Sequence, residues 1–168
     1  PVSAGGDACG IVVCGLDREG MAWVLADHSV SGLRPEGWAR RVAAATAEWE
    51  ASLVVAEKNQ GGEMIESVLR GVEASLPVRL VSATRSKAER AIPVALRFET
   101  GRARLGGDLA ALEEELRGFT HAGYRGAGSP DRADAMVWAM SELIAPHPEP
   151  RVRAFPWTKA LDVQRLAP

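Results

Sequence analysis

The feature that most constrains this chain is a short apolar run at residues 52–56, which ends abruptly at the charged Glu57. Continuous apolar runs of this length are typical of central strands that are buried on both faces of a sheet. Apolar side chains then recur at helical spacing in residues 63–73, and residues 78–81 form a second strand-like run. The sequence therefore predicts a right-handed βαβ unit with two parallel strands, which places the chain in the α/β class.

The segments before this unit favour the same class of fold. Residues 8–14 and 21–26 are rich in alternating and β-branched side chains and are joined by a polar segment, which predicts an antiparallel β-hairpin. Pro35 suits the first turn of a helix, and apolar side chains at helical spacing continue that helix to about residue 50. We expect this helix to cover a sheet.

A capping-box pattern marks the start of another helix. Ser86 and Glu89 have the spacing at which each side chain bonds the backbone of the other residue, so a helix should begin there and end near Gly101. Pro93 lies inside this segment. Because proline removes a helical hydrogen bond, we expect Pro93 to kink or interrupt the helix.

Two more helices are predicted near the C-terminus. Asp108 can cap a helix that stops at Gly118, and a glycine-rich loop follows. Ser129 and Pro130 are suited to the N-cap and first position of a last helix over residues 131–144.

The length of 168 residues suits one compact domain with a single core. We assign residues 1–145 to this domain and residues 146–168, which begin with closely spaced prolines, to a C-terminal tail. Residues 1–6 have neither an initiator Met nor a basic region, so we expect a boundary cut from a longer parent, not a signal peptide. No apolar run approaches the ~20 residues needed to cross a bilayer, so we expect no membrane partner.

Charge and cysteine usage narrow the class of protein further. A net charge of −2 argues against a protein that coats nucleic acid by charge alone. Residues 79–104 nevertheless hold seven basic residues against two acidic ones, so one face or edge should be electropositive. Cys9 and Cys14 point to opposite faces of a predicted strand, and we expect free thiols in a reducing cytosol.

Three acidic residues are candidates for chemistry. Glu57 ends a predicted core strand, at the sheet edge where open α/β folds bind ligands. Asp131 and Asp134 share one face of the first turns of the last helix. Carboxylates that converge from separate segments, without Cys or His beside them, suit Mg²⁺ or Mn²⁺ and the phosphoryl-transfer chemistry of paired metals.

Each acid also has a structural interpretation, and spacing alone leaves both open. Glu57 can be a solvated strand-end acid, and Asp131 can be an ordinary partner of the helix dipole. Asp134 directly precedes the apolar residues 135–140, so we expect its side chain at the edge of the core.

Several other chemistries are disfavoured by motifs that the sequence lacks. It has no phosphate-binding G-x-x-x-x-G-K-[ST] loop, no G-x-S-x-G elbow and no dinucleotide fingerprint. Hydrolysis of ATP by this chain is therefore not expected.

Five segments carry a resemblance when they are taken together: a glycine-rich opening and strand at 5–13, a strand end at 54–62, and residues 87–102, 112–116 and 129–139. The Glu-Lys-Asn-Gln-Gly-Gly motif at 57–62 and the last segment are fairly specific in combination. The chain thereby resembles, over residues 1 to about 145, the nuclease domain of the large terminase subunit of tailed phages and phage-like gene transfer agents. The resemblance implies a ribonuclease H-like α/β fold, with a mixed central sheet and helices on both faces.

The resemblance also implies an activity and partners. Such a domain is a metal-dependent endonuclease that cuts concatemeric double-stranded DNA during genome packaging, with two Mg²⁺ or Mn²⁺ ions. The expected partners are double-stranded DNA, an N-terminal ATPase domain of the parent chain, the portal and the small terminase subunit. The expected location is the cytoplasm of a bacterial host cell.

Residue by residue, the resemblance makes Glu57 the second acid of the family's triad and Asp134 the third, both catalytic and metal-binding. Asp131 becomes an auxiliary metal ligand. The family's first acid is an aspartate that ends the first strand, just before a segment like residues 1–6, so we expect this chain to begin after it and to bind metal or cut DNA weakly. Asp7 corresponds to a supporting residue near the metals.

The candidate DNA-phosphate contacts are Lys58, Arg85, Lys87 and Arg90. A solvated helix face is the alternative interpretation of the last three. Two other functions stay open on the same scaffold: a non-catalytic module that docks on DNA or the portal, and another ribonuclease H-like nuclease such as a junction resolvase.

Overall fold

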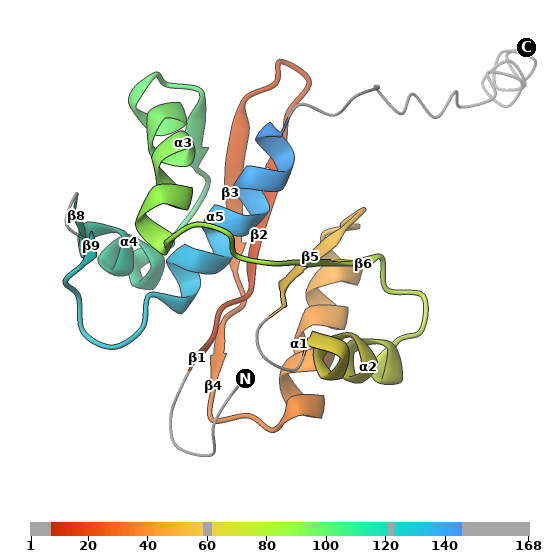
Figure 1. The fold of residues 1–168 in the computed structure, drawn as a ribbon. Helices are drawn as coiled ribbons and strands as arrows, with labels where there is room; N and C mark the ends of the chain where they lie inside the picture. The colour runs from red at the N-terminus through yellow and green to blue at the C-terminus, as the bar shows by residue number, and fades with distance from the viewer. Residues whose placement is uncertain (1–7, 59–61, 121–122, 146–168) are drawn as a thin grey trace, which may run out of the picture.

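The computed structural model describes residues 8–58, 62–120 and 123–145, and shows five helices among them (Figure 1). The helices are α1 (Pro35–Glu48), α2 (Gly62–Val72), α3 (Lys87–Glu99), α4 (Ala110–Arg117) and α5 (Asp131–Ile144). The strands are β1 (Ala8–Cys9), β2 (Val12–Leu16), β3 (Ala22–Asp27), β4 (Val30–Ser31), β5 (Val54–Glu57), β6 (Val78–Val81), β7 (Ala103–Leu105), β8 (Phe119–Thr120) and β9 (Gly123–Tyr124). No helix in the described ranges is long and apolar enough to cross a membrane.

Two groups of strands form the sheet layer. In the first group, β3 pairs antiparallel with β2 and parallel with β7, with a bulge in β2 between Val13 and Cys14. In the second group, β5 and β6, which precede and follow α2 in the chain, pair in parallel. The hairpin and the parallel βαβ unit are therefore confirmed, whereas β7 was not predicted.

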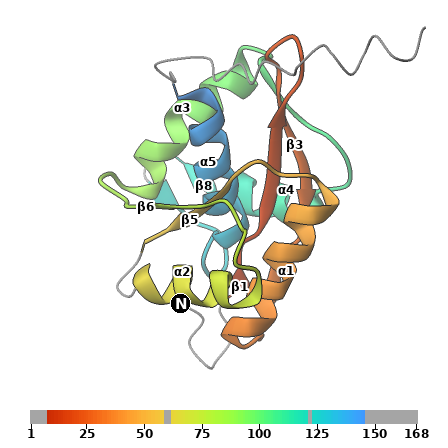
Figure 2. The ribbon, with the colours of Figure 1, turned by 90° about the vertical axis from the view of Figure 1, so that its right-hand side faces the viewer.

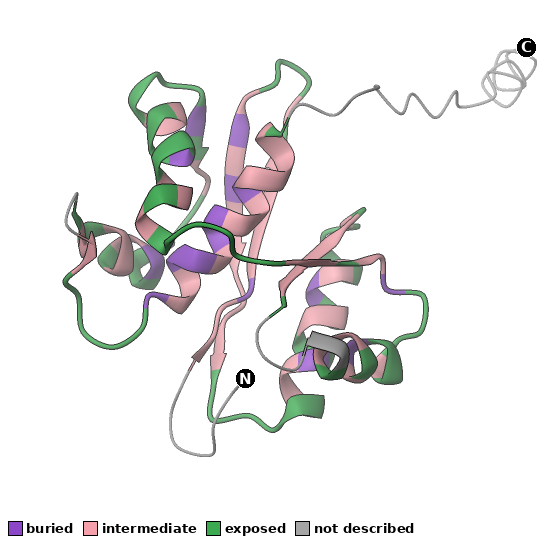
Figure 3. Cartoon of the chain, in the orientation of Figure 1, coloured by how far each residue is buried: buried purple, intermediate pink, exposed green. Residues whose placement is uncertain are grey.

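Helix α5 joins the two groups because it packs on β2 and β3 and also on β5 (Figure 1). One apolar cluster unites α3, α4 and α5 with β2, β3 and β7, and includes the fully buried Val24, Leu112 and Met140. A second, smaller cluster lies between α1, α2 and the β5–β6 pair, around Leu69 and Leu76. The buried residues accordingly lie along α5, on β3 and at the packing of α1 and α2 (Figure 3). Figure 2 shows α1 and α2 side by side.

Strand β5 is less buried than its apolar sequence predicts. All four of its residues are half-buried, and within the described chain β5 pairs with β6 alone. A cavity of about 200 Å³ lies on its other side, lined by residues of β2, β5, α1 and α5. Strand β5 packs against α5 and against the α1–α2 cluster, but its residues are half-buried and not fully buried as expected.

The predicted helix starts are partly right. The capping box of α3 is present, because the Glu89 amide donates to the Ser86 hydroxyl while the Ser86 amide donates to the Glu89 carboxylate. The Ser86 hydroxyl also donates to Oε2 of Glu89, and this bond, with the one from the Ser86 amide, lowers the pKa of Glu89. Helix α3 continues through Pro93, so the expected interruption is absent.

The caps of α4 and α5 differ from the prediction by one residue. Leu109 is the N-cap of α4, and the Asp108 carboxylate accepts from the amide of Ala110, the first residue of the helix, at 3.4 Å, so Asp108 caps the helix from one position earlier. Pro130 is the N-cap of α5, and the Ser129 hydroxyl instead donates to Oδ1 of Asp131.

Candidate functional site

Three of the predicted acids line one cavity of about 440 Å³. Glu57 is the last residue of β5, and Asp131 and Asp134 lie in the first turn of α5. The cavity also contacts β1, α1 and α2, so it opens where both strand groups approach α5. Glu57 and Asp134, which lie 77 positions apart in the sequence, thus line the same cavity.

The first turn of α5 is fixed by a close approach of the backbone. The Asp134 amide donates to the Pro130 carbonyl at 2.8 Å, which closes the first helical turn. Gly10, between β1 and β2, lies against this turn so closely that a Cβ there would overlap the carbonyl of Asp131. Asp134 is buried, as expected for a residue at the edge of the core.

Two cationic side chains of α3 bind the Asp134 carboxylate. Nη2 of Arg90 donates to Oδ1 at 2.5 Å, and Nζ of Lys87 lies 3.2 Å from Oδ2. Because the capping box starts α3 at Lys87, these side chains lie three positions apart on one helix face. Each carboxylate oxygen therefore has its own cation, and we call Lys87 and Arg90 the cation clamp.

Arg90 is held by more than Asp134. Its guanidinium lies 4.5 Å from the ring centre of Trp138, and Nη1 donates to the Arg85 carbonyl at 3.0 Å. Nη1 also lies 3.9 Å from Oε1 of Glu57, so the guanidinium stands between the two principal acids. The Arg90 side chain is only 9% exposed, and its Nε has no hydrogen-bond partner among the described residues.

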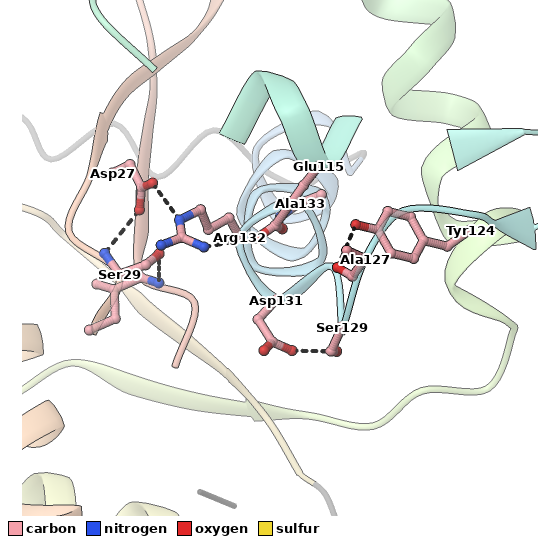
Figure 4. A network of polar contacts seen from close by, with 10 residues as sticks. Asp27, Ser29, Glu115, Tyr124, Ala127, Ser129, Asp131, Arg132 and Ala133 are labelled. Atoms are coloured by element: carbon pink, nitrogen blue, oxygen red, sulfur yellow. Dashed lines mark hydrogen bonds and ion pairs between the residues drawn. The ribbon is translucent and has the colours of Figure 1, made fainter. Parts of the chain in front are cut away.

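A second arginine anchors the same helix turn from the other side (Figure 4). Nε of Arg132 donates to Asp27, the last residue of β3, and its Nη1 donates to Glu115 of α4. The Ala133 amide donates to the other oxygen of Glu115 at 3.0 Å. These contacts raise the pKa of Arg132, chiefly through its hydrogen bond to Glu115, and tie α5 to both neighbours.

The remaining predicted residues lie around this centre. Lys58 follows Glu57 and is exposed, and its amide donates to the Val81 carbonyl at the end of the parallel strand pair. Arg85 is exposed just before α3. Asp7 lies outside the described residues.

A family model for the terminase RNaseH-like domain matches residues 1–143. The chain belongs to the terminase RNase H-like domain family. The ribonuclease H-like α/β fold that the resemblance implied is thereby confirmed.

A solved structure supports this assignment of the fold. The terminase RNase H-like domain described here is similar to the large terminase nuclease from the thermophilic phage G20c, crystallised with bound cobalt, at a TM-score of 0.60. The two chains are 18% identical, and the match covers 82% of each. A search of curated proteins gives no match.

The acids that line the cavity of this terminase domain offer carboxylate oxygens, which are the ligands that hard divalent cations prefer. Within residues 8–58, 62–120 and 123–145, however, no three His, Cys, Asp or Glu side chains gather into a group that could hold a metal. Glu57 and Asp134 line the same cavity, and the Arg90 guanidinium lies close to both carboxylates.

Sequence reasoning missed three residues that shape the site: Gly10, Arg132 and Trp138. Trp138 follows Asp134 by one helical turn, so the i, i+4 rule could have placed its ring beside the acid. Arg132 lies between two acids of the motif, which is a signal for a charged anchor. Gly10 carries no such local signal, because its role depends on a helix more than a hundred positions away.

Proposed function

We propose that this terminase domain is a metal-dependent endonuclease that cuts double-stranded DNA during genome packaging. The observation that carries the proposal is that Glu57 and Asp134, from β5 and α5, face one cavity in a chain of the terminase RNase H-like family. Acids at the end of a parallel strand occupy the position where open α/β sheets bind ligands.

The chain's own residues supply the ligands of this activity. Glu57 and Asp134 would hold two divalent cations, Mg²⁺ or Mn²⁺, with Asp131 as an auxiliary ligand and Asp7 as a supporting one. The chemistry that such cations supply is activation of water and neutralisation of phosphate charge. The cobalt of the phage G20c nuclease supports the use of a divalent cation.

The DNA contacts are proposed on the exposed basic residues next to the cavity. Lys58 and Arg85 are exposed, and the Lys87 side chain is 43% exposed while it binds Asp134. Such side chains can neutralise backbone phosphates, which makes binding fall steeply with salt. Arg90 is buried against the acids, so any contribution from Arg90 to DNA binding requires its side chain to move outward.

The decisive experiment is cleavage of supercoiled plasmid in Mn²⁺ by the wild-type chain and by its Glu57→Gln and Asp134→Asn variants. We expect nicked and linear products from the wild type, and their loss in both variants. Glu114→Gln is the matched control, because the Glu114 side chain is 79% exposed on α4, outside the cavity. Undiminished cleavage by either acid variant, with folding verified by circular dichroism, contradicts the proposal.

A non-catalytic docking module is the second candidate, favoured by the cation clamp that occupies Asp134 and by the lack of a three-acid group in the described ranges. It predicts DNA or portal binding that is insensitive to Glu57→Gln and sensitive to Arg85→Gln. A junction resolvase would instead prefer branched over linear DNA. Gel shifts with this chain measure both the effect of each substitution on DNA binding and the preference for branched over linear DNA.

The partners follow from the packaging role. We propose that an ATPase domain of the parent chain, the portal and the small terminase subunit act with this domain in the cytoplasm of a bacterial host. Co-purification of the parent protein with portal tests this assignment.

A further inference from the structure

We propose that the cation clamp, Lys87 and Arg90, competes with divalent cations for Asp134 and so holds the site closed to metal until the metal is abundant. The proposal rests on the nuclease function above, because that function makes a divalent cation the ligand of Asp134. It concerns how tightly the site binds metal, which can be measured without DNA or cleavage.

The Asp134 side chain is 10% exposed, and a buried carboxylate needs a positive partner or several hydrogen bonds. Arg90 and Lys87 supply these partners at 2.5 Å and 3.2 Å, one on each oxygen. These contacts compensate the burial of the carboxylate, and both oxygens that would bind a cation are already engaged.

Arg90 has contacts that do not involve Asp134, namely the Trp138 ring at 4.5 Å and the Arg85 carbonyl at 3.0 Å. These contacts can retain the side chain near the site after it releases the acid. Its Nε lacks a partner in the described part of the chain, so the bonds to Asp134 do not exhaust its donors.

A guanidinium within hydrogen-bond distance of the acid repels a divalent cation that approaches the same oxygens, and the low exposure of the site weakens solvent screening. Removing the positive charge should therefore tighten metal binding while it weakens the metal-free fold. These opposite effects distinguish competition from an ordinary stabilising ion pair.

The experiment measures Mn²⁺ affinity by isothermal titration calorimetry, and the thermal midpoint with and without Mn²⁺, for the wild type, Arg90→Gln and Lys87→Gln. We expect Arg90→Gln to lower the metal-free midpoint and to bind Mn²⁺ about tenfold more tightly. Lys87→Gln should change both in the same directions but less, because Lys87 is partly exposed. Arg117→Gln, which removes a surface charge of α4, is the control and should change neither.

The proposal is overturned if Mn²⁺ affinity is unchanged or weaker in the clamp variants, or if no variant binds Mn²⁺. Adding Asp134→Asn to each variant must abolish its gain in affinity, since the gain is assigned to that carboxylate. Should Arg90→Gln fail to fold, Lys87→Gln carries the test. Loss of the nuclease proposal would appear separately, as intact metal competition without plasmid cleavage.

Discussion

The guanidinium of Arg90 donates to the carboxylate of Asp134 at 2.5 Å, although the two residues lie 44 positions apart in the chain. Both side chains are about nine-tenths buried, so this ion pair lies inside the domain, between α3 and α5. The same pair joins a residue of the basic stretch to a candidate catalytic acid. Its strength therefore affects both the fold and the site.

Neutralising Asp134 should leave a buried positive charge without its partner. We expect Asp134→Asn to reduce the free energy of unfolding by about 3 kcal/mol, because breaking one side of a buried pair costs more than the pair contributes. Urea denaturation followed by circular dichroism measures this loss. Glu114→Gln, on the surface of α4, should stay within about 0.5 kcal/mol of the wild type. A similar small effect for Asp134→Asn would show that the ion pair is not energetically important.

The sequence predicts the local elements of this fold well, because their signals are local. The Ser86–Glu89 capping box begins α3, and apolar periodicity defines α5 over the predicted range. Strand β7 was missed because its three residues depend on parallel pairing with β3, about eighty positions earlier. Short strands of this kind have no periodicity of their own.

The sequence predicted the acids of the candidate site, but not the inward direction of the Arg90 side chain. Glu57 and Asp134 follow from motif and position, and the structure brings both to one cavity. Arg90 lies in a basic stretch, which indicates an exposed DNA contact, whereas its side chain is turned inward to Asp134. No local pattern distinguishes these directions, because the choice depends on where α5 packs against α3.

Arg132 should be a positioning residue for the first turn of α5. Replacing it with Gln removes the ion pairs to Asp27 and Glu115, and we expect a loss of about 2 kcal/mol of stability. Arg132→Lys should recover only part of this loss, because an ammonium cannot reproduce the planar fork. Hydrogen exchange should also quicken at the Ala133 amide, which donates to Glu115. Unchanged exchange there would argue against a positioning role.

The Cys14 thiol should make stability depend on alkaline pH. Burial raises the pKa of Cys14 from 9.0 to about 12. Between these values the unfolded chain loses the proton and the folded chain keeps it, so the free energy of unfolding falls as pH rises above 9. We expect this group to cost about 1.4 kcal/mol per pH unit in that window, and nothing below pH 8.

Urea denaturation at pH 8 and pH 10.5, for the wild type and Cys14→Ala, isolates this contribution. The variant should lose less stability than the wild type between the two pH values, because other alkaline titrations are common to both. Equal losses would mean that the thiol ionises in the folded state as it does in the unfolded chain.

A methyl group at Gly10 should disturb the acids of α5 through the backbone. An added Cβ would overlap the Asp131 carbonyl and stand 3.0 Å from the Cβ of Ala135, so the first turn of the helix must shift. We expect Gly10→Ala to cost about 2 kcal/mol, as overpacked sites do, and to reduce Mn²⁺-dependent plasmid cleavage. Gly71→Ala is the matched control, since a methyl group added at Gly71 of α2 would meet open space among the described residues and should gain about 0.5 kcal/mol. If Gly10→Ala were as stable and as active as Gly71→Ala, the contact between Gly10 and α5 would not position Asp131 and Asp134.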